Sequence, residues 1–207
     1  MQTRRSQIVG MAALILFALC SHSAFAWNDA TGVEKVQRVI ADLLQRHEGK
    51  QRTRDPRLLA EKSWSFYQPE LNAYLNHSIR SKKRFGVKSV QVALRERDYV
   101  VATVVVDFNQ VKIKDDSLFF KTAKSMFSGD QSMTVEGYVR TNSAGKGTFV
   151  LEKAYFGSLR IPAFLVNKVM QMVGQRQAPP IDPAQPTALP YGIQKIEIYN
   201  GMLKVKS

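Results

Sequence analysis

One segment of this chain, residues 99–108, is apolar on both of its faces. Successive residues of a strand point to opposite sides of the sheet. One face carries Val100, Ala102, Val104, Val106 and Phe108, and the other carries Tyr99, Val101, Thr103 and Val105. Antiparallel sheets usually keep one face in water, so a strand of this kind needs cover on each side. Two arrangements provide such cover: a central strand in a helix-covered sheet, or a wall that faces a ligand.

The hydrophobic pattern around this strand changes between helical and strand periodicity. Further strands are expected at residues 87–95, 133–140 and 148–157, and in a closing hairpin at 193–205 with its turn at Asn200-Gly201. Helices are expected at residues 33–44, 68–79 and 161–174, with a shorter amphipathic segment at 118–127. Two segments are interpreted as connections: a charged one at 46–57 and a proline-rich one at 178–190. The pattern predicts the α+β class.

The first 26 residues have the three parts of a secretory signal peptide. Arg4 and Arg5 precede an apolar run over residues 8–19, and Ala24-Phe25-Ala26 forms an A-x-A cleavage site. The alternative is a membrane anchor that is never cut, but the run has about half of the ~20 residues that span a bilayer. We therefore expect an exported protein, periplasmic or secreted, whose mature chain begins at Trp27 and forms a single domain over residues 27–207.

The expected mature chain is basic and contains no cysteine. Cys20, the only cysteine, lies in the leader, so the mature domain has neither a disulfide nor a thiol nucleophile. Without Arg4 and Arg5, 28 basic residues stand against 17 acidic ones, a net charge of +11. Outside the cytoplasm this charge favours phospholipid headgroups, anionic glycolipids or acidic cell-wall polymers as partners, rather than nucleic acid. About 180 residues can bury a core without disulfides, and we expect a monomer.

The sequence gives little support to catalysis or metal binding. His47 and His77 are the only histidines after the leader, and neither belongs to an H-x-x-x-H or H-E-x-x-H pattern. Both lie in polar segments and are expected at the surface. Glu70, Asp107 and Glu136 show no pairing, so a polysaccharide-active enzyme is a distant alternative. We expect a protein that is not an enzyme and has neither a metal nor a cofactor.

Four basic residues gather at the end of the second expected helix: Arg80, Lys82, Lys83 and Arg84. Positive charge at a helix C-terminus is stabilised by the helix dipole, so capping and solubility explain this cluster without a ligand. The alternative is that the cluster binds an anionic membrane surface.

Four short phrases of the sequence occur in a characteristic order. They are Phe66 with Glu70-Leu71-Asn72 and Leu75, Val106-Asp107-Phe108, Gly157-Ser158-Leu159-Arg160-Ile161-Pro162, and Leu189-Pro190-Tyr191-Gly192-Ile193. This order, over residues 60–205, resembles that of small exported bacterial proteins with tubular lipid-binding (TULIP-like) folds. The resemblance implies a long curved antiparallel sheet, a half barrel, wrapped around amphipathic helices. It also implies an apolar groove that takes acyl chains, and it implies no catalytic residues.

The leading hypothesis is therefore an envelope protein that binds lipids or other amphiphiles in a groove between sheet and helices. The residues expected to line the groove are Val104, Val106, Phe108, Phe119, Phe120, Phe127, Leu165, Val169 and Met172. Neither face of the central strand has enough polar residues to meet water, which motivates this choice. The rival hypothesis is a protein-interaction module of the cell envelope, whose groove is filled by its own side chains.

Overall fold

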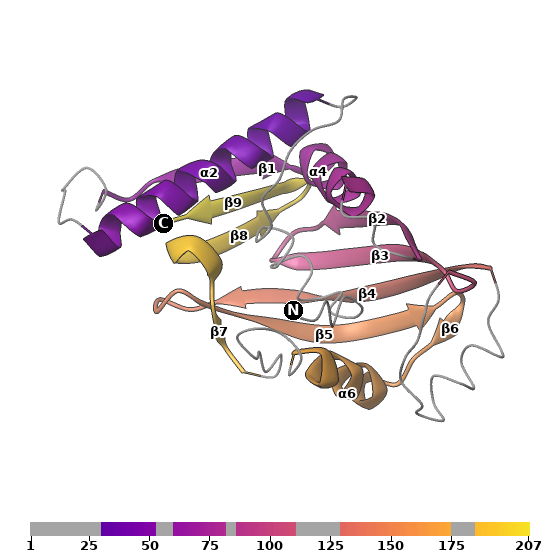
Figure 1. Cartoon of the computed structure of the whole chain (residues 1–207). Coiled ribbons are helices and arrows are strands. Elements are labelled where there is room, and N and C mark those ends of the chain that lie inside the picture. Colours follow the sequence, from indigo (N-terminus) through magenta and orange to yellow (C-terminus); the bar gives the residue numbers. More distant parts are fainter. Residues whose placement is uncertain (1–29, 53–59, 82–85, 111–128, 175–184) are drawn as a thin grey trace, which may run out of the picture.

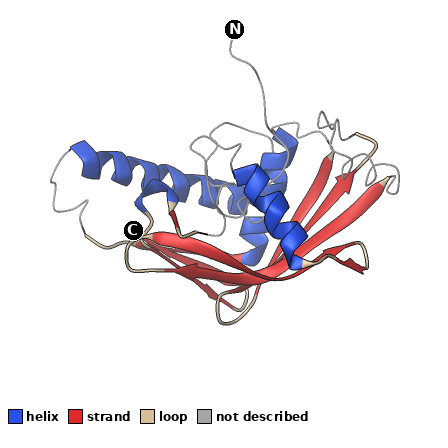
Figure 2. Ribbon diagram, turned by 90° about the horizontal axis from the view of Figure 1, so that it is seen from below, coloured by secondary structure: helices blue, strands red, loops and turns tan. Residues whose placement is uncertain are grey.

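The computed structural model describes residues 30–52, 60–81, 86–110, 129–174 and 185–207. Two antiparallel sheets lie on one side of the molecule and the α-helices lie on the other (Figures 1 and 2). The larger sheet is strongly curled, so that it forms a half barrel with its concave side toward the helices (Figure 2). This confirms the expected α+β class and the long curved sheet around amphipathic helices.

The larger sheet is built mainly from four long strands that follow one another in the chain. Its strand order is β2-β3-β4-β5-β6, and β7 pairs with the opposite end of β5. The strands are β2 (Val87–Leu94), β3 (Tyr99–Asp107), β4 (Asp130–Thr141), β5 (Lys146–Phe156), β6 (Leu159–Arg160) and β7 (Thr187–Ala188). The register aligns Val92, Ala102, Val135 and Ala154, which are all buried, across the concave face.

A smaller sheet of three strands joins distant parts of the chain. Its order is β1-β9-β8, with β1 at Ser63–Tyr67, β8 at Lys195–Tyr199 and β9 at Met202–Lys206. The β8–β9 hairpin turns at Asn200-Gly201, where Gly201 has a φ of 74° that suits a glycine. Strand β1 then pairs with β9, so Trp64 lies opposite Val205.

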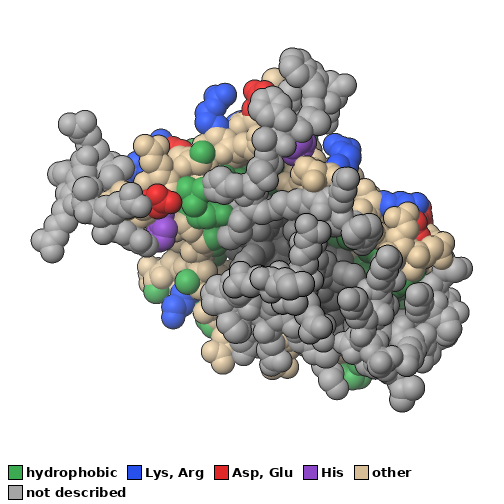
Figure 3. All heavy atoms as spheres, viewed as in Figure 1, with side chains coloured by type: hydrophobic (Ala, Val, Ile, Leu, Met, Phe, Trp, Pro, Cys, Tyr) green, Lys and Arg blue, Asp and Glu red, His purple; other side chains and the backbone are tan. Residues whose placement is uncertain are grey.

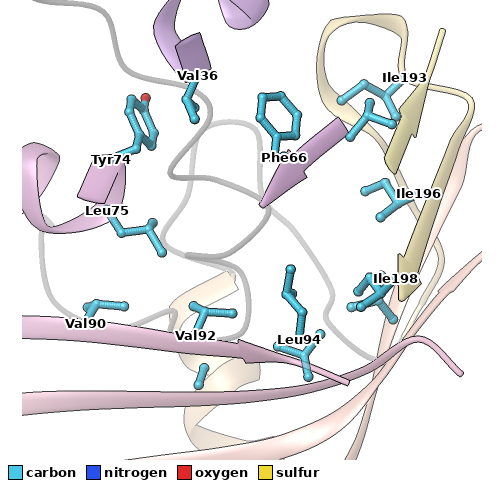
Figure 4. Close-up of a cluster of buried hydrophobic side chains, with 14 of the residues drawn as sticks. Val36, Phe66, Tyr74, Leu75, Val90, Val92, Leu94, Ile193, Ile196 and Ile198 are labelled. Atoms are coloured by element: carbon cyan, nitrogen blue, oxygen red, sulfur yellow. The ribbon is translucent and has the colours of Figure 1, made fainter. Parts of the chain in front are cut away.

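The core lies between both sheets and two helices, α2 (Ala30–Arg52) and α4 (Gln68–Ser81). Figure 4 shows side chains from α2, α4, β1, β2 and β8 pointing toward one another, with Phe66 only 1% exposed. Helix α4 corresponds to the helix expected at residues 68–79, and its apolar side supplies Leu75 and Ile79 to this core. Lys35 of α2 also donates to Glu70 of α4 at 2.8 Å, which ties the two helices at one end.

Helix α4 closes the outer edge of β2 with side-chain amides. Gln68, Asn72 and Asn76 are spaced four residues apart, so they lie along one side of the helix. Asn72 Nδ2 donates to the Val92 carbonyl at 3.0 Å, and its Oδ1 accepts the Val92 amide at 2.7 Å. Asn76 makes the same two contacts with Val90, and Gln68 Oε1 accepts from the Leu94 amide. This amide ladder takes the place of a neighbouring strand at an edge that would otherwise be open.

Asp98 connects the larger sheet to the smaller one. It lies in the β2–β3 turn with a φ of 61°, next to Arg97 with a φ of 58°. Its Oδ1 accepts the Ile198 amide at 2.7 Å, and its own amide donates to the Ile198 carbonyl. Asp98 therefore pairs with β8 as a strand residue would.

Asp98 should be replaceable by asparagine but not by alanine. Asp98→Ala loses the acceptor for Ile198 and places an alanine at positive φ, so we expect it to lower the free energy of unfolding by about 2–3 kcal/mol. An asparagine keeps the Oδ1 acceptor and tolerates the conformation, so Asp98→Asn should stay within about 0.5 kcal/mol of the parent. Urea unfolding measures both. Equal losses for the two variants would contradict this role.

Two sequence interpretations of local structure were wrong. The segment 46–57, interpreted as a connector, begins as helix, because α2 continues to Arg52. Arg46 is only 9% exposed, and its guanidinium donates to the Ala60 carbonyl, so this arginine belongs to the packed part of the helix. Strand β1 was not expected at all. It has five residues and leads directly into α4, so it offers little periodicity of its own.

The second face of β3 lies on the convex side of the half barrel. Val101, Thr103 and Val105 are half-buried there, and no described helix or strand packs over them (Figure 2). Their neighbours across the sheet include polar groups, and Thr103 Oγ1 lies 3.0 Å from Thr134 Oγ1. Within the described residues, the cover for this face therefore comes from adjacent strands, and not from a second layer.

Candidate functional site

The candidate site is one end of the concave face of the larger sheet. Four apolar side chains gather there: Val106, Phe108, Met133 and Phe156, here called the apolar wall. Met133 lies opposite both Val104 and Phe156 in the sheet, and the rings of Phe108 and Phe156 meet edge to face with centroids 5.4 Å apart. All four side chains are half-buried, whereas the same face under α4 is closed.

Buried polar contacts fix the end of β3 and so position Phe108. Asp107 is 8% exposed; its carboxylate accepts from the Asn109 amide and from Gln110 Nε2, and it faces Lys88 at 3.8 Å. The Phe108 amide donates to the Gly129 carbonyl at 3.0 Å. The phrase Val106-Asp107-Phe108 thus places two wall residues on either side of a structural carboxylate.

Helix α6 (Ala163–Gly174) borders the wall. It contacts β5, and the Ile161 amide before it donates to the Ala154 carbonyl at 2.8 Å. Ile161 and Val166 pack against the core, while Leu165 is half-buried. Figure 2 shows α6 on the concave side of the sheet, together with α2 and α4.

Of the nine expected groove residues, the structure describes the side chains of four, and these lie in different surroundings. Val106 and Phe108 belong to the apolar wall, and Leu165 lies on α6. Val104 is 4% exposed and belongs to the core. The other five expected positions, Phe119, Phe120, Phe127 and the side chains of Val169 and Met172, lie outside what the structure describes.

Sequence reasoning missed Met133 and Phe156 as members of the site. Regular alternation over the expected strand 148–157 would place Phe149, Leu151, Lys153 and Tyr155 on one face. The β4–β5 register shifts at Glu136/Gly137, so Gly137 lies opposite Leu151 while Glu136 lies opposite Lys153. This β-bulge moves Lys153 and Tyr155 to the convex face and turns Phe156 inward. One sequence signal could have revealed the bulge. In the run Ala154-Tyr155-Phe156 three apolar or aromatic residues follow one another, which breaks the alternation of the residues before it.

The basic cluster is described only in part. Arg80 is exposed in the last turn of α4, as expected for a capping or membrane-facing residue. Lys82, Lys83 and Arg84 lie outside the described residues. Figure 3 shows blue side chains at several separate places on the visible face, so the described basic residues on that face do not form a single patch.

The polar groups of the convex face pair with one another. Tyr99 Oη donates to Glu136 Oε2 at 2.8 Å, and Lys153 Nζ lies 3.9 Å from the same oxygen. Burial, and next the Glu136 carboxylate, raise the pKa of Tyr99 to about 12. Tyr138 packs against Tyr99 and lies under the Arg140 guanidinium. These contacts stabilise the sheet and direct no reactive group toward a cleft.

One expectation about the histidines was wrong. His77 was expected at the surface but is 8% exposed on α4, and His47 is half-buried. Within the described residues, no group of histidine, cysteine, aspartate and glutamate side chains could hold a metal ion. The same part of the chain has no helix with the length and hydrophobicity needed to cross a bilayer.

Comparisons of the chain with family models, with curated proteins and with solved structures found no match.

Proposed function

We propose that this is an exported envelope protein that binds lipids or other amphiphiles on the concave side of its half barrel. The observation that carries the proposal is the apolar wall, four half-buried apolar side chains gathered at one end of the curled sheet beside α6. Each buried methylene of an acyl chain contributes about 0.8 kcal/mol, so one long chain against such a surface supplies on the order of 10 kcal/mol before ordering costs. The leader over residues 4–26 supports export.

A specific observation favours the rival proposal, a protein-interaction module with a filled core. Under α2 and α4 the concave face is closed by the chain itself, and Val90, Val92 and Val104 are all 8% exposed or less. If the same packing continued over the apolar wall, no acyl chain would fit there. The two proposals therefore differ in what covers Met133 and Phe156.

Native mass spectrometry of the purified protein, followed by lipid extraction, tests the first proposal directly. A matched pair of variants locates the site, because Val105 and Val106 are adjacent, half-buried and on opposite faces of β3. Val106→Thr combined with Met133→Gln should weaken uptake of a fluorescent fatty acid about tenfold or more, because polar atoms then meet the acyl chain. Val105→Thr should leave uptake unchanged.

Urea unfolding of the same variants separates the two proposals. A lipid-binding surface tolerates polar atoms in the absence of ligand, so the concave variant should lose less than about 1 kcal/mol of stability. A loss of several kcal/mol, with no lipid bound to the parent protein, would favour the interaction module and exclude lipid binding at this wall.

A further inference from the structure

The corner between β6 and α6, residues 157–164, exposes two large apolar side chains. Leu159 is 64% exposed and Phe164 is 68% exposed, more than any other large hydrophobic residue in the described part of the chain. Figure 1 places this corner at one end of the larger sheet. Large apolar side chains that are exposed to water within one short segment indicate an interaction surface for an apolar partner.

The backbone of the corner is held in place, so these side chains do not belong to a frayed loop. The Gly157 amide donates to the Ser132 carbonyl at 2.7 Å, and the Ile161 amide donates to the Ala154 carbonyl. Ile161, between the two exposed residues, packs against the core. The fold therefore anchors the segment at the half-buried Ile161 and presents Leu159 and Phe164 outward.

The corner and the helix that follows it carry only positive charge of their own. Residues 157–174 contain no aspartate or glutamate, while Arg160 and Lys168 are basic. Arg160 is exposed between Leu159 and Ile161, and no ion pair involves it within the described residues. Exposed leucine and phenylalanine next to unpaired positive charge complement the surface of an anionic bilayer, where apolar groups enter the acyl boundary and cations meet phosphates.

We propose that the β6–α6 corner is the part of the protein that docks on an anionic phospholipid bilayer, with Leu159 and Phe164 inserted and Arg160 at the headgroups. The corner adjoins the apolar wall, because Leu159 lies opposite Phe156 and Phe156 contacts Phe108. Transfer of a lipid from the bilayer to the wall at this point rests on the proposed lipid-binding function. The docking itself does not.

Sedimentation with vesicles of phosphatidylglycerol and phosphatidylcholine tests the docking. Leu159→Ser combined with Phe164→Ser should weaken vesicle binding at least tenfold, because two insertable side chains are lost. Arg160→Gln should weaken it about fivefold and reduce its salt dependence. The control is Val150→Ser combined with Tyr199→Ser, two other exposed apolar residues (44% and 46%), and it should bind as the parent does.

A fluorescent label reports whether the corner enters the bilayer. Cys20 is the only cysteine of the chain, so Phe164→Cys in a Cys20→Ser background carries one environment-sensitive dye at the corner. We expect a blue shift and brighter emission with anionic vesicles, and little change with pure phosphatidylcholine. Three results would overturn the proposal. The emission spectrum could stay unchanged with anionic vesicles, or the Leu159→Ser/Phe164→Ser variant could bind vesicles as well as the parent. The blue shift could also appear only when an envelope protein is added, and not with vesicles.

The outcome for docking is independent of the outcome for lipid uptake. Loss of vesicle binding with normal fatty-acid uptake by the serine variant supports the corner as the docking site. Vesicle binding by the parent without any bound or transferable lipid would remove the proposed function and leave the docking surface in place.

Discussion

Replacing Asn72 with alanine is expected to lower the free energy of unfolding by about 2–5 kcal/mol. The side chain makes two hydrogen bonds to Val92, at 2.7 and 3.0 Å, and Val92 is 2% exposed. Without the amide, a buried backbone N–H and a buried C=O are left unpaired, and each costs about 1–3 kcal/mol. Asn167→Ala is the control, because Asn167 is an exposed helical asparagine on α6, and it should be close to neutral.

An aspartate at the same position gives a test that depends on pH. The introduced carboxylate would keep the acceptor for the Val92 amide, but its second oxygen would face the Val92 carbonyl in place of a donor. The folded state then favours the protonated acid, so the pKa of the introduced aspartate would be raised above its unfolded value of about 3.9. Asn72→Asp should therefore approach the parent below about pH 4 and lose stability as the pH rises through its folded pKa. Urea unfolding of parent and variant at about pH 3.5 and about pH 7 measures the difference, and a constant difference would contradict the geometry.

The second large effect is expected from valine at Gly137. A Cβ at this position would collide with the Val150 carbonyl oxygen and lie 2.8 Å from Phe149 Cζ. The position is next to the bulge between β4 and β5, where the strands have already changed register. Overpacking of a core costs about 1–3 kcal/mol when side chains can give way. Here a backbone atom must move, so we expect a loss of about 3 kcal/mol or more in urea unfolding.

Two further variants identify the cause of the loss at Gly137. Gly129→Ala also changes a glycine, but nothing lies within 4 Å of its Cβ, so only its positive φ of 72° is strained and about 1 kcal/mol should be lost. Gly137→Ala combined with Phe149→Leu relieves the ring contact and leaves the backbone collision. Full recovery in this double variant would show that the Phe149 ring, and not the backbone of β5 at Val150, excludes a side chain at Gly137.

Periodicity was sufficient to predict the parts of the fold that face a core on one side only. The apolar stripe of Leu71, Tyr74, Leu75 and Ile79 indicated α4, and the alternation in residues 87–95 indicated β2. Strand β1 was missed because it forms only by pairing with β9 at the other end of the chain. The sequence pattern near β1 contains no information about a partner strand so distant in the sequence.

The amide ladder was missed for a different reason. Gln68, Asn72 and Asn76 are polar residues on an amphipathic helix, and such residues normally face water. Here they lie beside the apolar stripe and not opposite it, at a constant spacing of four. That spacing was visible in the sequence, but only the exposed edge of β2 shows what the amides bind.

The candidate site was predictable only along β3. Val106 and Phe108 follow from strand alternation, whereas Met133 and Phe156 depend on a bulge that changes which residues of β5 face inward. A bulge adds one residue to one strand without a strong signal in composition. The sequence therefore indicated an apolar surface and half of its members.

The pairing of β1 with β9 has a consequence for how this chain is made. Strand β1 is made early, but its partner β9 follows every other strand that the structure describes. Until then Trp64 and Phe66 have no partner strand, and an unpaired edge with aromatic residues is prone to aggregation. By contrast, the ladder between α4 and β2 joins residues close in sequence and can form while synthesis continues. A chain cut short before Met202 would thus keep its local pairings and yet leave the core residue Phe66 without its partner strand.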